Sequence, residues 1–262
     1  MDTASSSSLI EKAEAICLQI HPWSKTSHVV TWLTPGFGKV TTVVKGACRP
    51  KSAFLGQYDL AYTCELLFYR RERDGVHAIR ECWPICIREP LRVNWRASSL
   101  AAYLCGLTAR STVGAQESDS VFRLLSSTLD MLAEERPQDW LGLLLWYETH
   151  LLRLIGFMPD LTLCPTCHTE EHPWFRFSLA SGRFICEHRA GQGTDRQDNM
   201  VQLHQGVRKL LIRMGNAPAP FPITEPETVR TGLIRFLGIF YRFHLDLPLS
   251  ERNVMLELLQ GG

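Results

Sequence analysis

The sequence lacks long apolar runs and the motifs of the common hydrolases. No apolar segment approaches the roughly 20 residues that a helix needs to cross a bilayer. No HExxH, G-x-S-x-G or Walker A motif occurs in the 262 residues. The N-terminus has no basic start, and charges at Glu11, Lys12 and Glu14 interrupt its apolar stretch, so a signal peptide is not indicated. We therefore expect a cytoplasmic protein that does not enter the membrane.

Acidic residues are missing from one long stretch near the N-terminus. From Ala15 through Tyr58 there is no Asp or Glu. The same stretch contains five cations: Lys25, Lys39, Lys45, Arg49 and Lys51. It also contains the aromatic residues Trp23, Trp32, Phe37 and Phe54. Single-strand-binding barrels use cations for phosphates and aromatic faces for bases, but the pattern fits equally a solvated loop surface beside an aromatic core.

The cysteines do not form an obvious disulfide framework. Their number is odd, nine, and most stand singly inside apolar runs, as Cys17, Cys64, Cys86 and Cys105 do. A free cysteine in such a run behaves as a small buried hydrophobe. The pattern favours a reducing compartment.

Residues 13–90 predict a small β-barrel. Five segments rich in β-branched and aromatic residues are separated by Gly, Pro or Ser: AEAICLQI, SHVVTWLT, GKVTTVVKG, DLAYTCELLFYRR and GVHAIRECWPICI. A five-stranded OB-fold barrel is the commonest way to close such a set, and an SH3-like barrel fits almost as well. We expect residues 1–12 to form a flexible N-terminal tail.

After Pro90 the apolar spacing becomes helical, so the predicted fold class is α+β, a barrel followed by an α-helical bundle. The first part of the helical domain spans 91–161, and the second spans 200–262. Helices are predicted over 97–110, 120–135, 138–156, 200–215 and 227–244. The last two are separated by the linker NAPAPFPITEP, whose four prolines exclude a helix.

Two polar residues fall on apolar faces of these predicted helices. Glu148 lies one turn from both Leu144 and Leu152, so it must find an arginine or a backbone partner. His204 lies on the apolar face of helix 200–215, where a satisfied core histidine is the favoured interpretation.

Residues 162–199 carry the spacing of a metal site. Cys164 and Cys167 are followed, after eighteen residues, by Cys186 and His188. Two ligand pairs at this separation are typical of a tetrahedral structural zinc site. The fourth ligand is open, because His168 and His172 are rivals of His188. The alternative is that the cysteines remain only as buried thiols.

The segment between the cysteine pairs, WFRFSLASGRFIC, predicts a hairpin that turns at Ser181 and Gly182, as in a zinc ribbon-like insertion. Catalysis by the metal is not indicated, since nucleobase deaminases require an H-x-E before the cysteine pair and none precedes Cys164. We expect Zn²⁺ to be structural.

Two further stretches resemble the bacterial recombination mediator family RecO. GKVTTVVKGACRPKS at 38–52 is similar to the family's G-K, K-G and basic-P-K-S signature. WYETHLLRLIGFMPDLTLCPTC at 146–167 is similar to its E-x-x-L-L-x-x-x-G-x-x-P-x-L-x-x-C-x-x-C pattern. Two departures are that Cys48 stands where the family often has a basic residue, and that the second ligand pair is C-x-H.

The resemblance implies an N-terminal OB-fold, a helical domain, a zinc-binding insertion and a non-enzymatic function. That function is binding single- and double-stranded DNA, annealing strands coated with single-strand binding protein, and loading RecA together with RecR. It also implies a bacterial, nucleoid-associated protein without a small-molecule substrate. The family's basic barrel residues correspond to Lys39, Lys45, Arg49 and Lys51, which we expect to form one face.

For the tail of single-strand binding protein we expect a surface on the basic helices, at Arg208, Arg213, Arg235 and Arg242. The alternative function is a non-catalytic, zinc-stabilised OB-fold scaffold that binds protein and whose basic residues are incidental. A metal-dependent nuclease is a weaker alternative, because it needs carboxylates converging on a metal and the barrel stretch has none.

Overall fold

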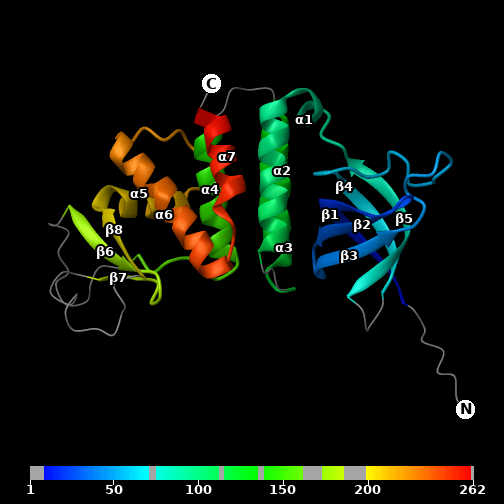
Figure 1. Cartoon of the computed structure of the whole chain (residues 1–262), viewed down its shortest axis with the longest axis horizontal. Coiled ribbons are helices and arrows are strands. Elements are labelled where there is room, and N and C mark those ends of the chain that lie inside the picture. The colour runs from blue at the N-terminus through cyan, green and yellow to red at the C-terminus, as the bar shows by residue number, and fades with distance from the viewer. Residues whose placement is uncertain are drawn as a thin grey trace, which may run out of the picture. The chain divides into compact units, whose positions relative to one another are not determined.

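The computed structural model describes residues 9–70, 75–111, 115–134, 139–161, 173–185 and 199–260. The chain divides into two compact units, residues 1–136 and 137–262, and each is described by itself (Figure 1). No helix among the described residues is long and apolar enough to cross a membrane.

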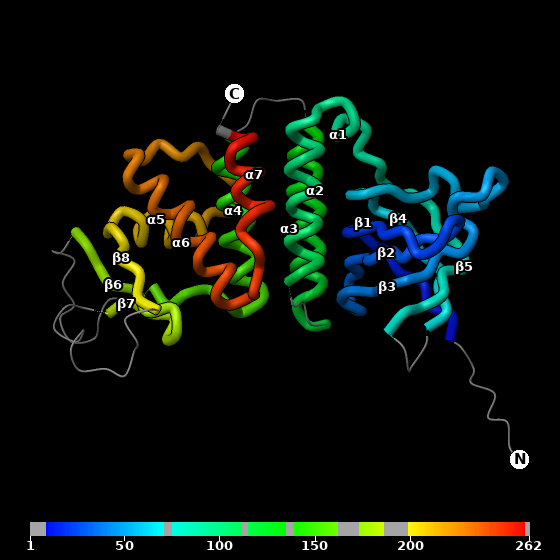
Figure 2. Tube along the Cα trace, viewed as in Figure 1, coloured from blue at the N-terminus to red at the C-terminus, as the bar shows by residue number. Residues whose placement is uncertain are grey.

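The N-terminal unit is built on a closed five-stranded barrel. Its strands are β1 (Ile10–Ser24), β2 (Ser27–Thr34), β3 (Gly38–Val44), β4 (Thr63–Tyr69) and β5 (Val76–Cys86). Their order around the barrel is β1-β2-β3-β5-β4, with β3 parallel to β5 and the other pairs antiparallel. Figure 2 shows the trace of this unit, with the strands in blue to cyan. The predicted OB-type barrel followed by helices is confirmed. The predicted tail is too long, because Ile10, Glu11 and Lys12 already pair with β4.

Side chains from alternate positions of the strands fill the barrel. Along β3, Val40, Thr42 and Val44 are buried, while Lys39, which precedes them, is exposed. Trp32 of β2 is fully buried, and its indole N–H donates to Thr42 Oγ1 at 2.9 Å. This hydrogen bond satisfies the one polar atom that a buried tryptophan brings into a core.

Three helices belong to the same compact unit as the barrel. They are α1 (Pro90–Val93), α2 (Trp95–Arg110) and α3 (Ser118–Ala133). Helix α2 packs on β1 and β2, and α3 packs on β2 and β3. The Asn94 side chain caps α2 by accepting from the Ala97 N–H at 3.2 Å. Because the barrel and these three helices lie in one compact unit, residues 1–136, the domain boundary expected at residues 90–91 does not separate the two compact units.

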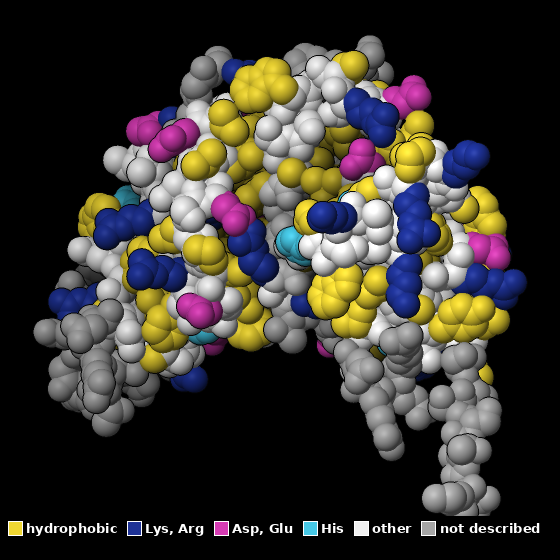
Figure 3. All heavy atoms as spheres, turned by 45° about the vertical axis from the view of Figure 1, so that its right-hand side comes forward, with side chains coloured by type: hydrophobic (Ala, Val, Ile, Leu, Met, Phe, Trp, Pro, Cys, Tyr) yellow, Lys and Arg dark blue, Asp and Glu magenta, His cyan; other side chains and the backbone are white. Residues whose placement is uncertain are grey.

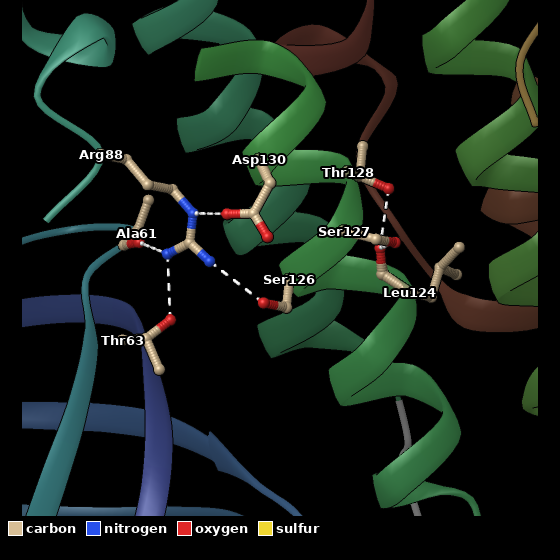
Figure 4. Close-up of polar contacts among 8 residues, drawn as sticks. All are labelled: Ala61, Thr63, Arg88, Leu124, Ser126, Ser127, Thr128 and Asp130. Atoms are coloured by element: carbon tan, nitrogen blue, oxygen red, sulfur yellow. Dashed lines mark hydrogen bonds and ion pairs between the residues drawn. The ribbon is translucent and has the colours of Figure 1, made fainter. Parts of the chain in front are cut away.

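Arg88 joins the barrel to α3 (Figure 4). Its guanidinium donates to the Ala61 carbonyl at 2.8 Å, to Thr63 Oγ1 at 3.0 Å and to Ser126 Oγ at 3.1 Å. The Nε–H also forms an ion pair with Asp130 at 2.7 Å. Since Arg88 is only 6% exposed, its charge depends on these partners for the solvation that water would otherwise provide.

The C-terminal unit combines helices with a small sheet. Its helices are α4 (Trp140–Leu154), α5 (Gln205–Asn216), α6 (Glu227–Leu245) and α7 (Leu249–Gln260). The sheet has the order β7-β6-β8, from β6 (Trp174–Ser178), β7 (Arg183–Ile185) and β8 (Met200–His204). Helix α4 is buried along most of its circumference, as its apolar sequence predicts. Helix α7 was not predicted.

Glu148 of α4 finds the partner that its burial demands. Its two carboxylate oxygens each accept from Arg252 of α7 at 2.8 Å. Arg252 also donates to the Ile234 carbonyl of α6 at 2.9 Å. Glu148 is 0% exposed and Arg252 is 4% exposed. The expectation of an arginine partner is confirmed, and the pair links three helices.

The segment predicted as helix 200–215 begins as a strand. Met200–His204 pairs antiparallel with Trp174–Ser178, and the helix starts only at Gln205. His204 is not a core helical residue, because it caps α5 and its Nδ1 accepts from the Gly206 N–H at 3.0 Å. The local apolar spacing could not reveal this pairing, since β6 lies more than twenty residues earlier in the chain.

Candidate nucleic-acid interface

The turn between β1 and β2 lies beside the segment that follows β3. The Gly46 N–H donates to Ser27 Oγ at 3.2 Å, and the Cys48 N–H donates to the Thr26 carbonyl at 3.2 Å. Antiparallel pairing of β2 with β3 sets this arrangement, because His28 at the start of β2 faces Val44 at the end of β3. The two segments therefore form one end of the barrel.

Four of the five predicted DNA-binding cations gather at this end. Lys25 lies in the β1–β2 turn, whereas Lys45, Arg49 and Lys51 follow β3, and all four are exposed. We call these four residues the basic surface. Because no Asp or Glu occurs from residue 15 to residue 58, neither segment contains a carboxylate that would neutralise them. Lys and Arg side chains also lie close together on the face of the N-terminal unit turned to the viewer in Figure 3.

Gly46 shapes the start of the basic segment. Its φ of +71° lies in the left-handed region, which a glycine adopts without strain and which turns the chain directly after β3. A Cβ at this position would lie 3.3 Å from Cδ of Arg49, so the Arg49 side chain passes close to the glycine backbone. The Arg49 N–H closes the turn by donating to the Gly46 carbonyl at 3.1 Å.

Lys39 does not share a face with the basic surface, so the expectation of one face with Lys45, Arg49 and Lys51 is wrong. Lys39 lies near the start of β3, whereas Lys45 directly follows its end. Six residues of extended chain separate them by about 20 Å. The ammonium of Lys39 donates to the Ala109 carbonyl at 2.8 Å and to the Ser111 carbonyl at 2.7 Å, at the C-terminus of α2.

A cation is favoured at that position because carbonyls at a helix C-terminus carry partial negative charge. Burial of the ammonium lowers the pKa of Lys39, although the residue as a whole is exposed. The contacts explain Lys39 as a cap of α2, and its contact with DNA stays a prediction.

The aromatic residues of the acid-free stretch divide between core and surface. Trp32 is buried, and Phe37 and Phe54 pack against the barrel core, so for these three the core interpretation holds. Trp23 is 69% exposed, directly before the turn that carries Lys25. Trp83 of β5 is 44% exposed and was not predicted as a surface aromatic residue. It follows the buried Cys82, so alternation along β5 turns its side chain to the other face of the strand.

The four arginines predicted to bind a protein partner differ in environment. Arg208 is only 8% exposed and donates to the Leu161 carbonyl at 2.8 Å, so the expectation that it presents its charge at a surface is wrong. Arg213 forms an ion pair with Glu225 at 2.5 Å. Arg235 and Arg242 are exposed on α6, and as partner contacts they stay predictions.

Arg235 is one of the residues that line a pocket in the C-terminal unit. The pocket has a volume of about 390 Å³ and is lined mainly by apolar groups, among them Trp174, Val207 and Phe236. Glu227 also lines it, so a bound group would meet both signs of charge.

The predicted zinc ligands Cys164, Cys167, Cys186 and His188 lie outside the described residues, as do His168 and His172. The predicted hairpin between them is confirmed. Strand β6 pairs antiparallel with β7, with Arg176 opposite Ile185, and Gly182 in the turn has a φ of +66°. Among the described residues, no three His, Cys, Asp or Glu side chains converge as metal ligands would.

Comparison with known proteins agrees with this architecture. The family described as "Recombination protein O N terminal" matches residues 9–87, and that described as "Recombination protein O C terminal" matches residues 92–253. A protein named DNA repair protein RecO from Bacillus mycoides (strain KBAB4) is 26% identical over 95% of this chain and 98% of its own length. The protein of the same name from Bacillus cereus (strain AH187) has the same identity and coverage. The two family matches together span both compact units, and the chain therefore belongs to the recombination protein O family.

Proposed function

We propose that this protein is a DNA-binding recombination mediator. It binds single- and double-stranded DNA, anneals complementary strands coated with single-strand binding protein, and helps load RecA together with RecR. Family membership supports a role in DNA repair and recombination. The observation that carries the DNA-binding part is the basic surface, four exposed cations on two adjacent segments that contain no carboxylate.

The mechanism is electrostatic. Lys25, Lys45, Arg49 and Lys51 replace counterions on the phosphate backbone, so they bind without regard to sequence. Annealing requires that repulsion between two strands is lowered while base edges remain free to pair. Cations on a protein surface satisfy both requirements, and the exposed face of Trp23 can stack on a base in addition. No catalytic residue is needed for this function.

Binding of a fluorescent single-stranded oligonucleotide should weaken steeply with salt. For single strands the logarithm of affinity falls with the logarithm of salt concentration by about 0.7 per neutralised phosphate, so four contacts predict a slope of about −3. Fluorescence anisotropy across a salt series measures this slope. A slope near zero would favour the alternative function, a protein-interaction scaffold whose basic residues are incidental.

We also propose a structural Zn²⁺ held by Cys164, Cys167, Cys186 and His188. The pairing of β6 with β7 supports this site, because Ile185, the residue before Cys186 in the sequence, pairs with Arg176 near the start of β6, and the first cysteine pair precedes β6 in the sequence. A tetrahedral site of thiolates and imidazole suits zinc. The ion would hold the ends of the hairpin together and would supply no reaction step.

Zinc should be present at about one atom per chain and should be lost when Cys164 and Cys167 are both replaced by serine. Structural zinc contributes on the order of 10 kcal/mol in small metal-binding domains, so the variant should unfold at a clearly lower temperature. Metal analysis and thermal unfolding measure these two effects. Cys86→Ser is the matched control, because Cys86 lies in the barrel and should not affect zinc content. Native protein purified without chelators but also without zinc would contradict the proposal.

A further inference from the structure

A cysteine, a histidine and a tyrosine form a hydrogen-bonded chain at the basic end of the barrel. Cys48 Sγ lies 3.2 Å from Nε2 of His28, and His28 Nδ1 lies 2.7 Å from the hydroxyl of Tyr58. The rings of His28 and Tyr58 meet edge to face, and Tyr58 in turn packs against the buried Trp32. A nucleophile within reach of a base, with the base held by a third group, is the arrangement of an activated nucleophile.

The hydrogen bonds define what each ring can do. If Nδ1 of His28 carries the proton and donates to the Tyr58 oxygen, Nε2 is free to accept the proton of the Cys48 thiol. Burial raises the pKa of Tyr58, so this residue remains a neutral phenol beside the imidazole. Tyr58 thereby fixes the orientation of His28 without adding a negative charge.

Cys48 differs from the other cysteines that the structure describes. It is the exposed one, whereas Cys17, Cys64, Cys82 and Cys105 are buried and Cys86 is of intermediate exposure. Burial raises the pKa of the Cys17 thiol, and it raises that of Cys105 to about 12. These buried thiols are inert under ordinary conditions, because the thiolate is the reactive form.

The cations near Cys48 favour an anionic reaction partner for its thiol. Lys45, Arg49 and Lys51 lie within three residues of Cys48, and the acid-free stretch offers no compensating carboxylate in the same segment. A cationic surface raises the local concentration of anions and speeds their association. A small disulfide with carboxylate groups therefore meets an exposed thiol, a base and a cationic surface at one place.

We propose that Cys48 is a reactive thiol that forms a mixed disulfide with anionic low-molecular-weight disulfides, with His28 as its base and Tyr58 as a positioning residue. The thiol proton moves to His28 Nε2, and the sulfur attacks one sulfur of the disulfide. The S–S bond breaks as the new Sγ–S bond forms, and the departing thiolate takes the proton from His28. Cys48 is oxidised, the released half of the disulfide is reduced, and a second thiol reverses the exchange.

The modification would regulate DNA binding, an effect that rests on the proposed function. Cys48 lies between Lys45 and Arg49 in the sequence, so a carboxylate-bearing adduct would sit within the basic surface. Its negative charges would oppose the phosphates that this surface binds. Formation of the adduct under oxidising conditions would then lower the affinity for DNA, and its removal under reducing conditions would restore that affinity.

The thiol assignment is tested by labelling the native full-length protein with the chromogenic anionic disulfide dithiobis(nitrobenzoate), with mass spectrometry to identify the labelled cysteine. We expect Cys48 to react first, at least about tenfold faster than Cys86. His28→Gln should lower the labelling rate of Cys48 by about tenfold or more, because the base is removed. The rate at Cys86 in the same sample should be unchanged, which shows that the barrel is folded.

Two further readouts separate chemistry from a structural effect. Imidazole added to His28→Ala should recover part of the lost rate at Cys48, which a structural role of His28 does not predict. Tyr58→Phe should slow Cys48 when His28 is present and have no effect in the His28→Gln background. The assignment is overturned if Cys48 reacts no faster than Cys86, or if it reacts equally fast in wild type and His28→Gln.

The regulatory part is tested by anisotropy with single-stranded DNA before and after treatment with oxidised glutathione. The wild type should bind at least about fivefold more weakly after treatment and recover with a reductant, whereas Cys48→Ser should bind equally in both conditions. Stoichiometric modification without a change in affinity would overturn the regulation. If the untreated protein does not bind DNA, the proposed function fails, while the labelling rates still decide the thiol assignment.

Discussion

Replacing Lys25, Lys45, Arg49 and Lys51 together with alanine should weaken binding of a single-stranded oligonucleotide by about a hundredfold or more at low salt. All four cations are exposed at one end of the barrel, and neither segment that carries them contains a carboxylate. The salt slope should fall by about 3 units, since each lost phosphate contact removes about 0.7. Anisotropy titrations at several salt concentrations give both quantities.

The matched control removes four other cations from the same unit. Lys12, Arg70, Arg80 and Arg123 are exposed and each forms an ion pair with a carboxylate. Replacing these four with alanine changes the net charge by the same amount, but should change affinity only a few-fold, because general attraction by net charge is screened by salt. Equal losses in the two variants would show that total charge, and not the basic surface, determines binding.

Arg252→Ala should lower the free energy of unfolding of the C-terminal unit by about 3–5 kcal/mol. The substitution leaves the carboxylate of Glu148 without the guanidinium that binds both of its oxygens, at a site where Glu148 is 0% exposed. It also leaves the Ile234 carbonyl without the Arg252 donor. Denaturant unfolding followed by tryptophan fluorescence would measure the change, because Trp146 lies on α4 with Glu148.

Two further variants show whether the lower stability of Arg252→Ala arises from loss of the ion pair with Glu148. Arg242→Ala, at an exposed position of α6, should change stability by less than about 0.5 kcal/mol. Replacing Glu148 and Arg252 together with methionine should recover much of the loss, since an apolar pair of similar volume often substitutes for a buried ion pair. If Arg252→Ala is no less stable than Arg242→Ala, the pair does not stabilise the unit as inferred.

Local sequence patterns predicted the helices and strands whose own apolar periodicity identifies the face that they bury. The five strands and the helices α2, α3, α4 and α6 were expected close to their observed positions, because apolar periodicity within each segment matches the face that it buries. The arginine partner of Glu148 was also expected, since burial of a lone carboxylate is costly whichever residue compensates it. The identity of that arginine, 104 residues away, was not.

The features that depend on distant contacts were missed. Lys39 resembles the other cations of its stretch, and only the packing of α2 on the barrel reveals that its ammonium caps a helix. Similarly, Met200–His204 has apolar spacing that fits a helix, but β6 offers it a strand to pair with. The approach of Cys48 to His28 was not predicted because the two residues are twenty positions apart and meet only through the pairing of β2 with β3.

The central claim is that this protein anneals DNA strands through its basic surface. The most direct measurement is annealing of complementary oligonucleotides that have been coated with single-strand binding protein, across a salt series, with no nucleotide and no added metal. The account predicts that the protein accelerates annealing and that the acceleration fades as salt rises. Folded protein that gives no acceleration at any salt concentration would contradict it.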